Sequence, residues 1–140
     1  MTTEEKQLLL RDLCARLPYG VKMRHKDEPG YEVLCQIDTF YEDMDGFRCL
    51  LRTTGPFGGF QDLNELKPYL RPMSSMTEEE KKEHDFYCGY KPYDENIGES
   101  YLTEYDMPDY IDFLYKHHLD WRGLIPMGLA LEAPGDMYKQ

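Results

Sequence analysis

Three consecutive runs of alternating apolar and polar residues constrain the fold of this chain more than any other feature. The runs span residues 21–25, 31–41 and 47–53. In the first run, Val21 and Met23 share the apolar side. In the second run, Val33, Cys35 and Ile37 share it. Because successive side chains of a strand point to opposite faces, this period of two predicts antiparallel strands with one buried face each.

The turn between the second and third runs determines how their faces match. A two-residue loop at Asp45-Gly46 would set the apolar face of one strand beside the polar face of the next. A three-residue loop that begins at Met44 matches the two apolar faces and places Gly46 where a left-handed residue is needed. We therefore predict that Tyr41 lies opposite Cys49.

Helical patterns flank these strands. Thr2 and Glu5 fit a capping box, which predicts a helix over residues 3–16 that stops at Pro18. The apolar face of this helix follows a helical period: Leu10, Leu13, Cys14 and Leu17.

The second half of the chain contains two more helical patterns. Thr77 and Glu80 fit another capping box, ahead of a polar helix that ends near Tyr87. Asp106, with Pro108 in the first turn, predicts a further helix. Its expected buried stripe consists of Ile111, Leu114, Tyr115 and His118.

Charge divides the chain near residue 75. Residues 1–75 hold 12 acids and 10 bases, whereas residues 76–140 hold 15 acids and 6 bases. We therefore predict a single α+β domain, 1–140, with an N-terminal helix, a small antiparallel sheet or partial barrel of 3–4 strands, and a C-terminal acidic helical segment. The helix and sheet would occupy 1–72, and the acidic helical unit, 73–140, would pack on them. The stretch 66–83 would be the hinge, with Lys67 and Arg71 extended because each precedes a proline.

The net charge of −11 excludes some partners. Phosphate backbones and acidic membrane surfaces both require Lys and Arg, so direct binding to nucleic acid or to a membrane is not expected. The N-terminal residues lack the apolar core of a signal peptide, which indicates a cytoplasmic protein.

The cysteines and histidines do not indicate a metal or a cofactor. None of the four cysteines sits in a CxxC pair, and we expect reduced, mostly buried thiols without zinc: Cys14, Cys35, Cys49 and Cys88. Adjacent histidines point about 100° apart on a helix, so His117 and His118 are expected to be one buried and one exposed side chain near a helix end. His84 and Cys88, with i,i+4 spacing, are too few ligands for a site.

An acidic segment rich in tyrosine is the strongest functional signal. Residues 83–112 contain nine acids and one base, with six tyrosines among them. Carboxylates steer a basic partner and tyrosines supply contact area, so we interpret this segment as a surface that docks a basic host or phage protein. In the extreme form it would mimic a nucleic acid. The candidate residues are Tyr93, Glu95, Glu99, Tyr101, Glu104, Tyr105, Asp106 and Asp109.

Two other classes of function remain open. A small-molecule binder would use a pocket between the sheet and the C-terminal helix. An enzyme would need Cys or His chemistry, but no nucleophile motif such as GxSxG is present, and "GPFGGF" at 55–60 lacks the ending of a phosphate-binding loop.

Three segments, "DLCARLPYGVK", "KPYLRPMSSMTEEEK" and "DWRGLIPMGLALEAP", resemble parts of small uncharacterised proteins of gut Bacteroides and of their phages and mobile elements. The resemblance covers about half of the chain. It implies a phage- or prophage-associated protein of the host cytoplasm, and it implies no activity, cofactor or site residue.

Overall fold

A computed structural model describes residues 1–26, 30–43, 46–54, 59–87 and 106–138. The first element is helix α1, Thr3–Arg16, and both hydrogen bonds of the predicted capping box are present. The hydroxyl of Thr2 accepts from the backbone N–H of Glu5, and the carboxylate of Glu5 accepts from the backbone N–H of Thr2. The predicted bounds of this helix are confirmed.

The strands form one open sheet rather than a barrel. Five antiparallel strands follow the order β4-β3-β2-β1-β5, and β6 joins β5 in parallel. Their bounds are β1 Lys22–His25, β2 Glu32–Asp43, β3 Gly46–Thr54, β4 Gly59–Asp62, β5 Leu66–Leu70 and β6 Leu131–Glu132. The predicted α+β class is confirmed, and the sheet has more strands than the three or four expected.

The pairing of β2 with β3 differs from the predicted register. Tyr41 lies opposite Arg48, and Cys49 lies opposite Phe40. The prediction that Tyr41 faces Cys49 is therefore wrong. Asp43 pairs with Gly46 across the turn, so the loop has two residues rather than three.

The two-residue turn sets this pairing, and two β-bulges in β2 then change the register farther from the turn. The register shifts once between Leu34 and Gln36 and again between Ile37 and Thr39. Each bulge sets two residues of one strand against one of its partner, and so reverses the alternation of faces. Leu34, which lies opposite Thr53, is buried, whereas Cys35, which falls at the first bulge and was expected to face the core, is exposed.

The main core lies between α1 and the sheet. It combines leucines of α1 with apolar residues in or next to four strands and in the chain after residue 120: Leu9, Leu10, Leu13, Val21, Met23, Leu34, Leu51, Leu63, Leu66, Leu70, Leu124, Leu129 and Ala130. The burial of Val21, Met23 and Leu51 confirms the faces predicted for β1 and β3. Cys14, placed on the apolar face of α1 by its spacing, is exposed instead. The side chains of Cys49 and Cys88 lie outside the described residues.

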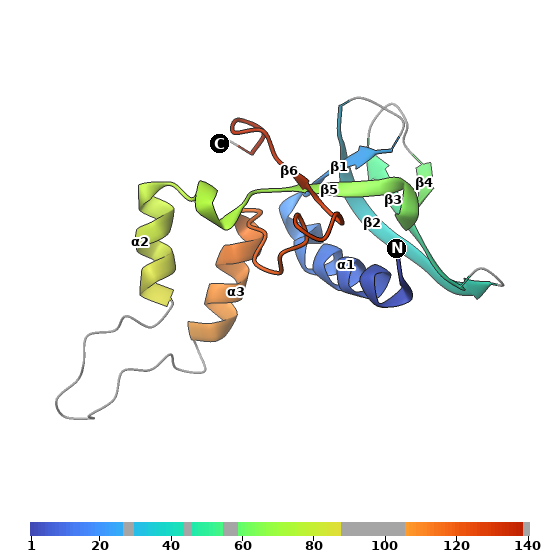
Figure 1. Cartoon of the computed structure of the whole chain (residues 1–140), viewed down its shortest axis with the longest axis horizontal. Coiled ribbons are helices and arrows are strands. Elements are labelled where there is room, and N and C mark those ends of the chain that lie inside the picture. Colours follow the sequence, from blue (N-terminus) through green and yellow to red (C-terminus); the bar gives the residue numbers. More distant parts are fainter. Residues whose placement is uncertain (27–29, 44–45, 55–58, 88–105, 139–140) are drawn as a thin grey trace.

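Helices α2, Glu78–Tyr87, and α3, Asp106–Lys116, lie side by side apart from the sheet (Figure 1). The chain after α3 returns past α1 to the sheet edge, where β6 pairs with β5. The described residues also contain three 3-10 turns: η1 Leu17–Tyr19, η2 Leu63–Glu65 and η3 Met73–Ser75. Residues 124–133 thus pack with the sheet, and the second core is confined to α3 and its surroundings.

A fully buried ion pair joins α1 to the chain after α3. Asp12 and Arg16 are both 0% exposed, and the Arg16 Nε donates to the Asp12 Oδ2 at 2.6 Å. The Arg16 Nη2 also donates to the backbone oxygen of Leu119 at 2.6 Å. Arg122 approaches Asp12 at 3.4 Å, and the Arg16 guanidinium lies over the ring of Tyr115. These contacts fix α1 relative to α3.

A tyrosine near the C-terminal end closes one end of the β1–β5 ladder. The Tyr138 hydroxyl accepts from the backbone N–H of Lys22 and donates to the backbone oxygen of Tyr69, both at 2.8 Å. The Lys22 ammonium donates to the backbone oxygen of Met137. The ring of His118 stacks on that of Tyr138, with 3.7 Å between centroids.

Candidate functional site

Helices α2 and α3 form an antiparallel pair that we name the acidic hairpin (Figure 1). Aromatic rings fill the space between them: Tyr87 lies 5.6 Å from Phe113 and 6.2 Å from Tyr110, centroid to centroid. The His84 Nε2 is 3.1 Å from the Tyr110 hydroxyl. Phe113 and Leu114 are buried in the second core, which confirms the buried side predicted for α3 at Leu114.

Arg71 fastens the acidic hairpin to the sheet. It directly follows β5, and its backbone forms two hydrogen bonds with the chain after α3. The Arg71 N–H donates to the backbone oxygen of His118, and the Asp120 N–H donates to the backbone oxygen of Arg71, both at 2.8 Å. Its guanidinium donates to both oxygens of Glu80, at 2.7 and 2.8 Å. It also donates to the backbone oxygens of Ser75 and His117. One side chain therefore links β5, η3, α2 and the end of α3.

Glu80 lies at the centre of this joint and also caps α2. Its carboxylate accepts from the backbone N–H of Thr77 at 2.8 Å, and the Thr77 hydroxyl accepts from the backbone N–H of Glu80. The predicted capping box is confirmed. The imidazole Nδ1 of His117 is 2.9 Å from the same carboxylate. Hydrogen bonds from Arg71 lower the pKa of Glu80 to about 2, against burial, which raises it.

The stretch 66–83 is therefore only partly a junction. Its first five residues form β5, a strand within the sheet. Lys67 lies in this strand and Arg71 bridges Leu119 in parallel, so the prediction that both are extended is confirmed. Thr77 then begins the helical part as predicted.

Carboxylates dominate the exposed surface of the acidic hairpin. The two helices carry eight acids and three lysines. Glu80 is buried, and the exposed acids are Glu78, Glu79, Glu83, Asp85, Asp109 and Asp112. Phe86 is 59% exposed near the end of α2, beside Asp85. We name Glu83, Asp85, Phe86, Asp109 and Asp112 the acidic end.

The sequence-predicted residues meet this surface at the start of α3. Asp106 begins α3, although its side chain lies outside the described residues, and Asp109 is exposed in the first turn. The other six candidates lie outside the described residues: Tyr93, Glu95, Glu99, Tyr101, Glu104 and Tyr105. Phe86 and Asp112 were not among the candidates. Their positions on exposed sides of the two helices are the signal that identifies them.

The two adjacent histidines have different surroundings. His118 is buried and has a positive φ of 59°. Burial is the main cause that lowers its pKa to about 4, assisted by the charges of Arg16 and Arg71. His117 is half-buried, with 24% of its side chain exposed. Among the described residues, no three or more His, Cys, Asp or Glu side chains are grouped to hold a metal ion.

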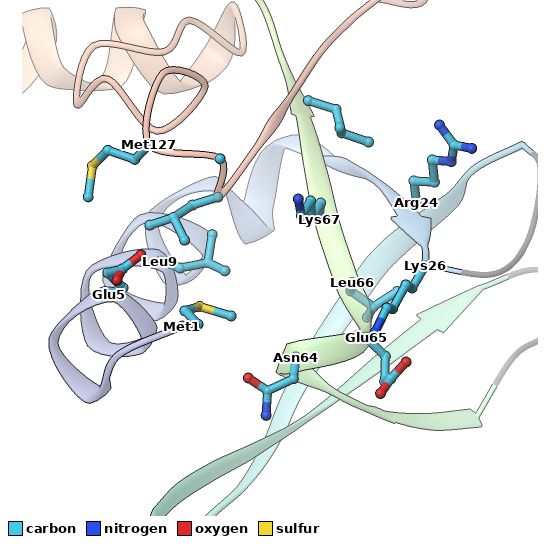
Figure 2. Close-up of a pocket in the computed structure, with 13 residues that line it drawn as sticks. Met1, Glu5, Leu9, Arg24, Lys26, Asn64, Glu65, Leu66, Lys67 and Met127 are labelled. Carbon is cyan, nitrogen blue, oxygen red and sulfur yellow. The ribbon is translucent and has the colours of Figure 1, made fainter.

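A pocket of about 710 Å³ lies on another side of the molecule (Figure 2). It is bounded by the start of α1, by residues 64–67 and by the segment 127–131. The small-molecule interpretation placed a pocket between the sheet and the C-terminal helix, whereas this one is bordered by α1 and not by α3.

The described helices are each too short or too polar to cross a lipid bilayer. Comparisons with protein-family models, with curated proteins and with solved structures gave no match for this chain.

Proposed function

We propose that this protein is a non-enzymatic accessory factor that binds a basic protein surface through the acidic hairpin. The observation that carries the proposal is the acidic end, where four exposed carboxylates and a largely exposed phenylalanine lie on the last turns of α2 and the first turns of α3. In the setting implied by the resemblance, the partner is a host or phage protein and the factor acts in the host cytoplasm.

The contacts that hold the acidic hairpin against the sheet support a binding role. Arg71 and Glu80 hold α2 and α3 in one arrangement, so docking would require little ordering of the backbone. Carboxylates accelerate association with a basic partner and set its orientation, and a central aromatic ring supplies most of the buried contact area. Asp109 belongs to this surface, and the six candidates within 93–105 remain predictions for its extension.

Charge reversal on the hairpin tests this proposal. The protein is immobilised, incubated with host lysate and eluted by a salt gradient, and the eluted proteins are identified by mass spectrometry. The hairpin variant carries Asp109→Lys and Asp112→Lys. A matched variant carries Glu132→Lys and Asp136→Lys, which changes the charge equally at exposed positions outside the hairpin.

The expected result is a basic protein that the parent and the matched variant capture and that salt releases, but that the hairpin variant does not capture. Phe86→Ser should lower capture without altering the salt at which release occurs. Release of that protein by added duplex DNA would identify the hairpin as a nucleic-acid mimic. Equal capture by the hairpin variant and the matched variant, or capture that salt does not affect, would overturn the proposal.

A further inference from the structure

The pocket beside β5 contains an apolar floor and an exposed apolar rim. Leu9, Leu66 and Leu129 are at most 5% exposed and line it. Met1 and Met127 lie on its border and are 50% and 45% exposed (Figure 2). They are two of the four large apolar side chains that the described residues leave exposed. Volumes of about 300–1,000 Å³ are typical of ligand sites, so this pocket is large enough for a small molecule.

Two cations on adjacent strands line the pocket, and the described residues supply no counter-ion to either of them. Arg24 of β1 pairs directly with Lys67 of β5, and both side chains are exposed. Like charges on opposite residues of adjacent strands destabilise a sheet. Neither side chain forms a hydrogen bond or an ion pair with another described residue. In a chain of net charge −11, this arrangement favours an anion from outside the protein.

The acids that line the pocket limit the charge of that anion. The carboxylate of Glu5 belongs to the capping box of α1, where it accepts a hydrogen bond from the backbone N–H of Thr2. Glu65 precedes β5, and its backbone oxygen accepts from the N–H of Lys26, which also lines the pocket. A second negative charge on the ligand would be repelled by Glu65, so a monoanion fits better than a phosphate dianion.

A peptide strand added to β5 is not the favoured occupant. β6 pairs only with Tyr69 and Leu70, which leaves the start of β5 open on that side. Leu70 accepts from Ala133 on this side, so the alternating backbone groups of Pro68 and Leu66 face it too. Pro68 has no N–H, and the N–H of Leu66 already donates to Leu63. The open edge therefore offers no free N–H donor to an incoming strand.

We propose that this pocket binds a small amphipathic carboxylate, with its head group at Arg24 and Lys67 and its aliphatic chain against Leu9, Leu66, Leu129 and Met127. Such a ligand neutralises the paired cations and covers the exposed methionine surface in a single step. This site is separate from the acidic hairpin, so the two proposals can fail independently.

Decanoate is the probe, followed by the ε-methyl NMR signals of ¹³C-methionine-labelled protein. We expect saturable shifts at Met1 and Met127 and none at Met73 and Met76, which pack in the second core. The variant R24Q/K67Q should bind decanoate about tenfold or more weakly. R11Q/K116Q, which removes two exposed cations outside the pocket, should bind like the parent. Decanol, with the same chain and no charge, should bind weakly to both the parent and R24Q/K67Q.

Three results would overturn the proposal: shifts that do not saturate, shifts of equal size at all the methionines, or unchanged affinity in R24Q/K67Q. Decyl phosphate distinguishes a carboxylate site from a general anion site. Binding of the phosphate monoester at pH 7.5 that is tighter than that of decanoate would contradict the preference for a monoanion.

Discussion

The two oxygens of Glu80 each accept a hydrogen bond from a terminal nitrogen of Arg71, at 2.8 and 2.7 Å, in a bidentate pair. The pair joins residues nine positions apart, one after the last antiparallel strand and one in the first turn of α2. It therefore couples the position of the acidic hairpin to the sheet.

Glu80→Gln should destabilise the protein by about 3 kcal/mol near neutral pH, because it leaves the half-buried Arg71 without its counter-ion. The pKa of Glu80 is lowered to about 2 from 4.5, so its stabilisation is complete above pH 4.5 and is lost as pH falls toward 2. Urea denaturation at several pH values measures this. Between pH 4.5 and 2, the parent should lose the stability that Glu80 contributes, and Glu80→Gln should show no such loss. Glu78→Gln, a change at an exposed position, should lose stability in this window as the parent does.

Asp12→Asn should be among the most damaging single changes, costing about 3–5 kcal/mol, because it leaves Arg16 charged and fully buried. The double variant Asp12→Leu/Arg16→Met should recover much of that loss, since it removes both charges and keeps apolar volume. Chemical denaturation of the parent, the single variant and the double variant measures the difference. A double variant that is less stable than Asp12→Asn would show that the pair contributes more than mutual neutralisation.

His118 should make stability depend on pH in a different window. Its pKa is lowered to about 4 from 6.5, so its neutral form stabilises the fold fully above pH 6.5, and this contribution is lost as pH falls toward 4. The loss should be on the order of 3 kcal/mol. His118→Asn removes the titrating group and tolerates the positive φ, so its stability should change less between pH 6.5 and 4.5. His25→Asn, a change outside this region, should leave the pH dependence of the parent in place.

Local patterns in the sequence were sufficient to predict both capped helices. The bonds of Thr2 with Glu5 and of Thr77 with Glu80 each span three residues, so the signal and the structure lie in the same short segment. The buried faces of β1 and β3 could also be predicted, because apolar and polar residues alternate along them without interruption. The α+β class follows from these elements together.

The register of β2 with β3 could not be predicted from the residues of β2 alone. Alternation in the sequence places Cys35 with Val33, but the bulge between Leu34 and Gln36 depends on how β3 pairs across it. The stretch that begins at Leu66 was predicted to be a hinge, yet Pro68 lies within β5, where β6 does not extend far enough to require its missing N–H. Both features are determined by neighbouring strands that are distant in sequence.

The sequence did not predict the ion pairs Asp12–Arg16 and Arg71–Glu80, because charged side chains are usually solvated. Asp12 and Arg16 lie at i+3 and i+7 from Leu9, on the same side of α1 as Leu13, and that spacing was the available signal. The role of Arg71 has no comparable local signal, since four of its partners belong to α2 and to the chain around the end of α3. For the acidic end, the excess of carboxylates was visible in composition, whereas Phe86 became a candidate only once α2 was located.

The bond from Lys22 to Tyr138 has a consequence for the order of folding. It closes a loop of 116 residues, so the first residue of β1 can form this bond only after residue 138 has been synthesised. Contacts this distant in sequence form slowly. We therefore expect the bond between Lys22 and Tyr138 to form late in folding, after α1 has packed on the antiparallel strands.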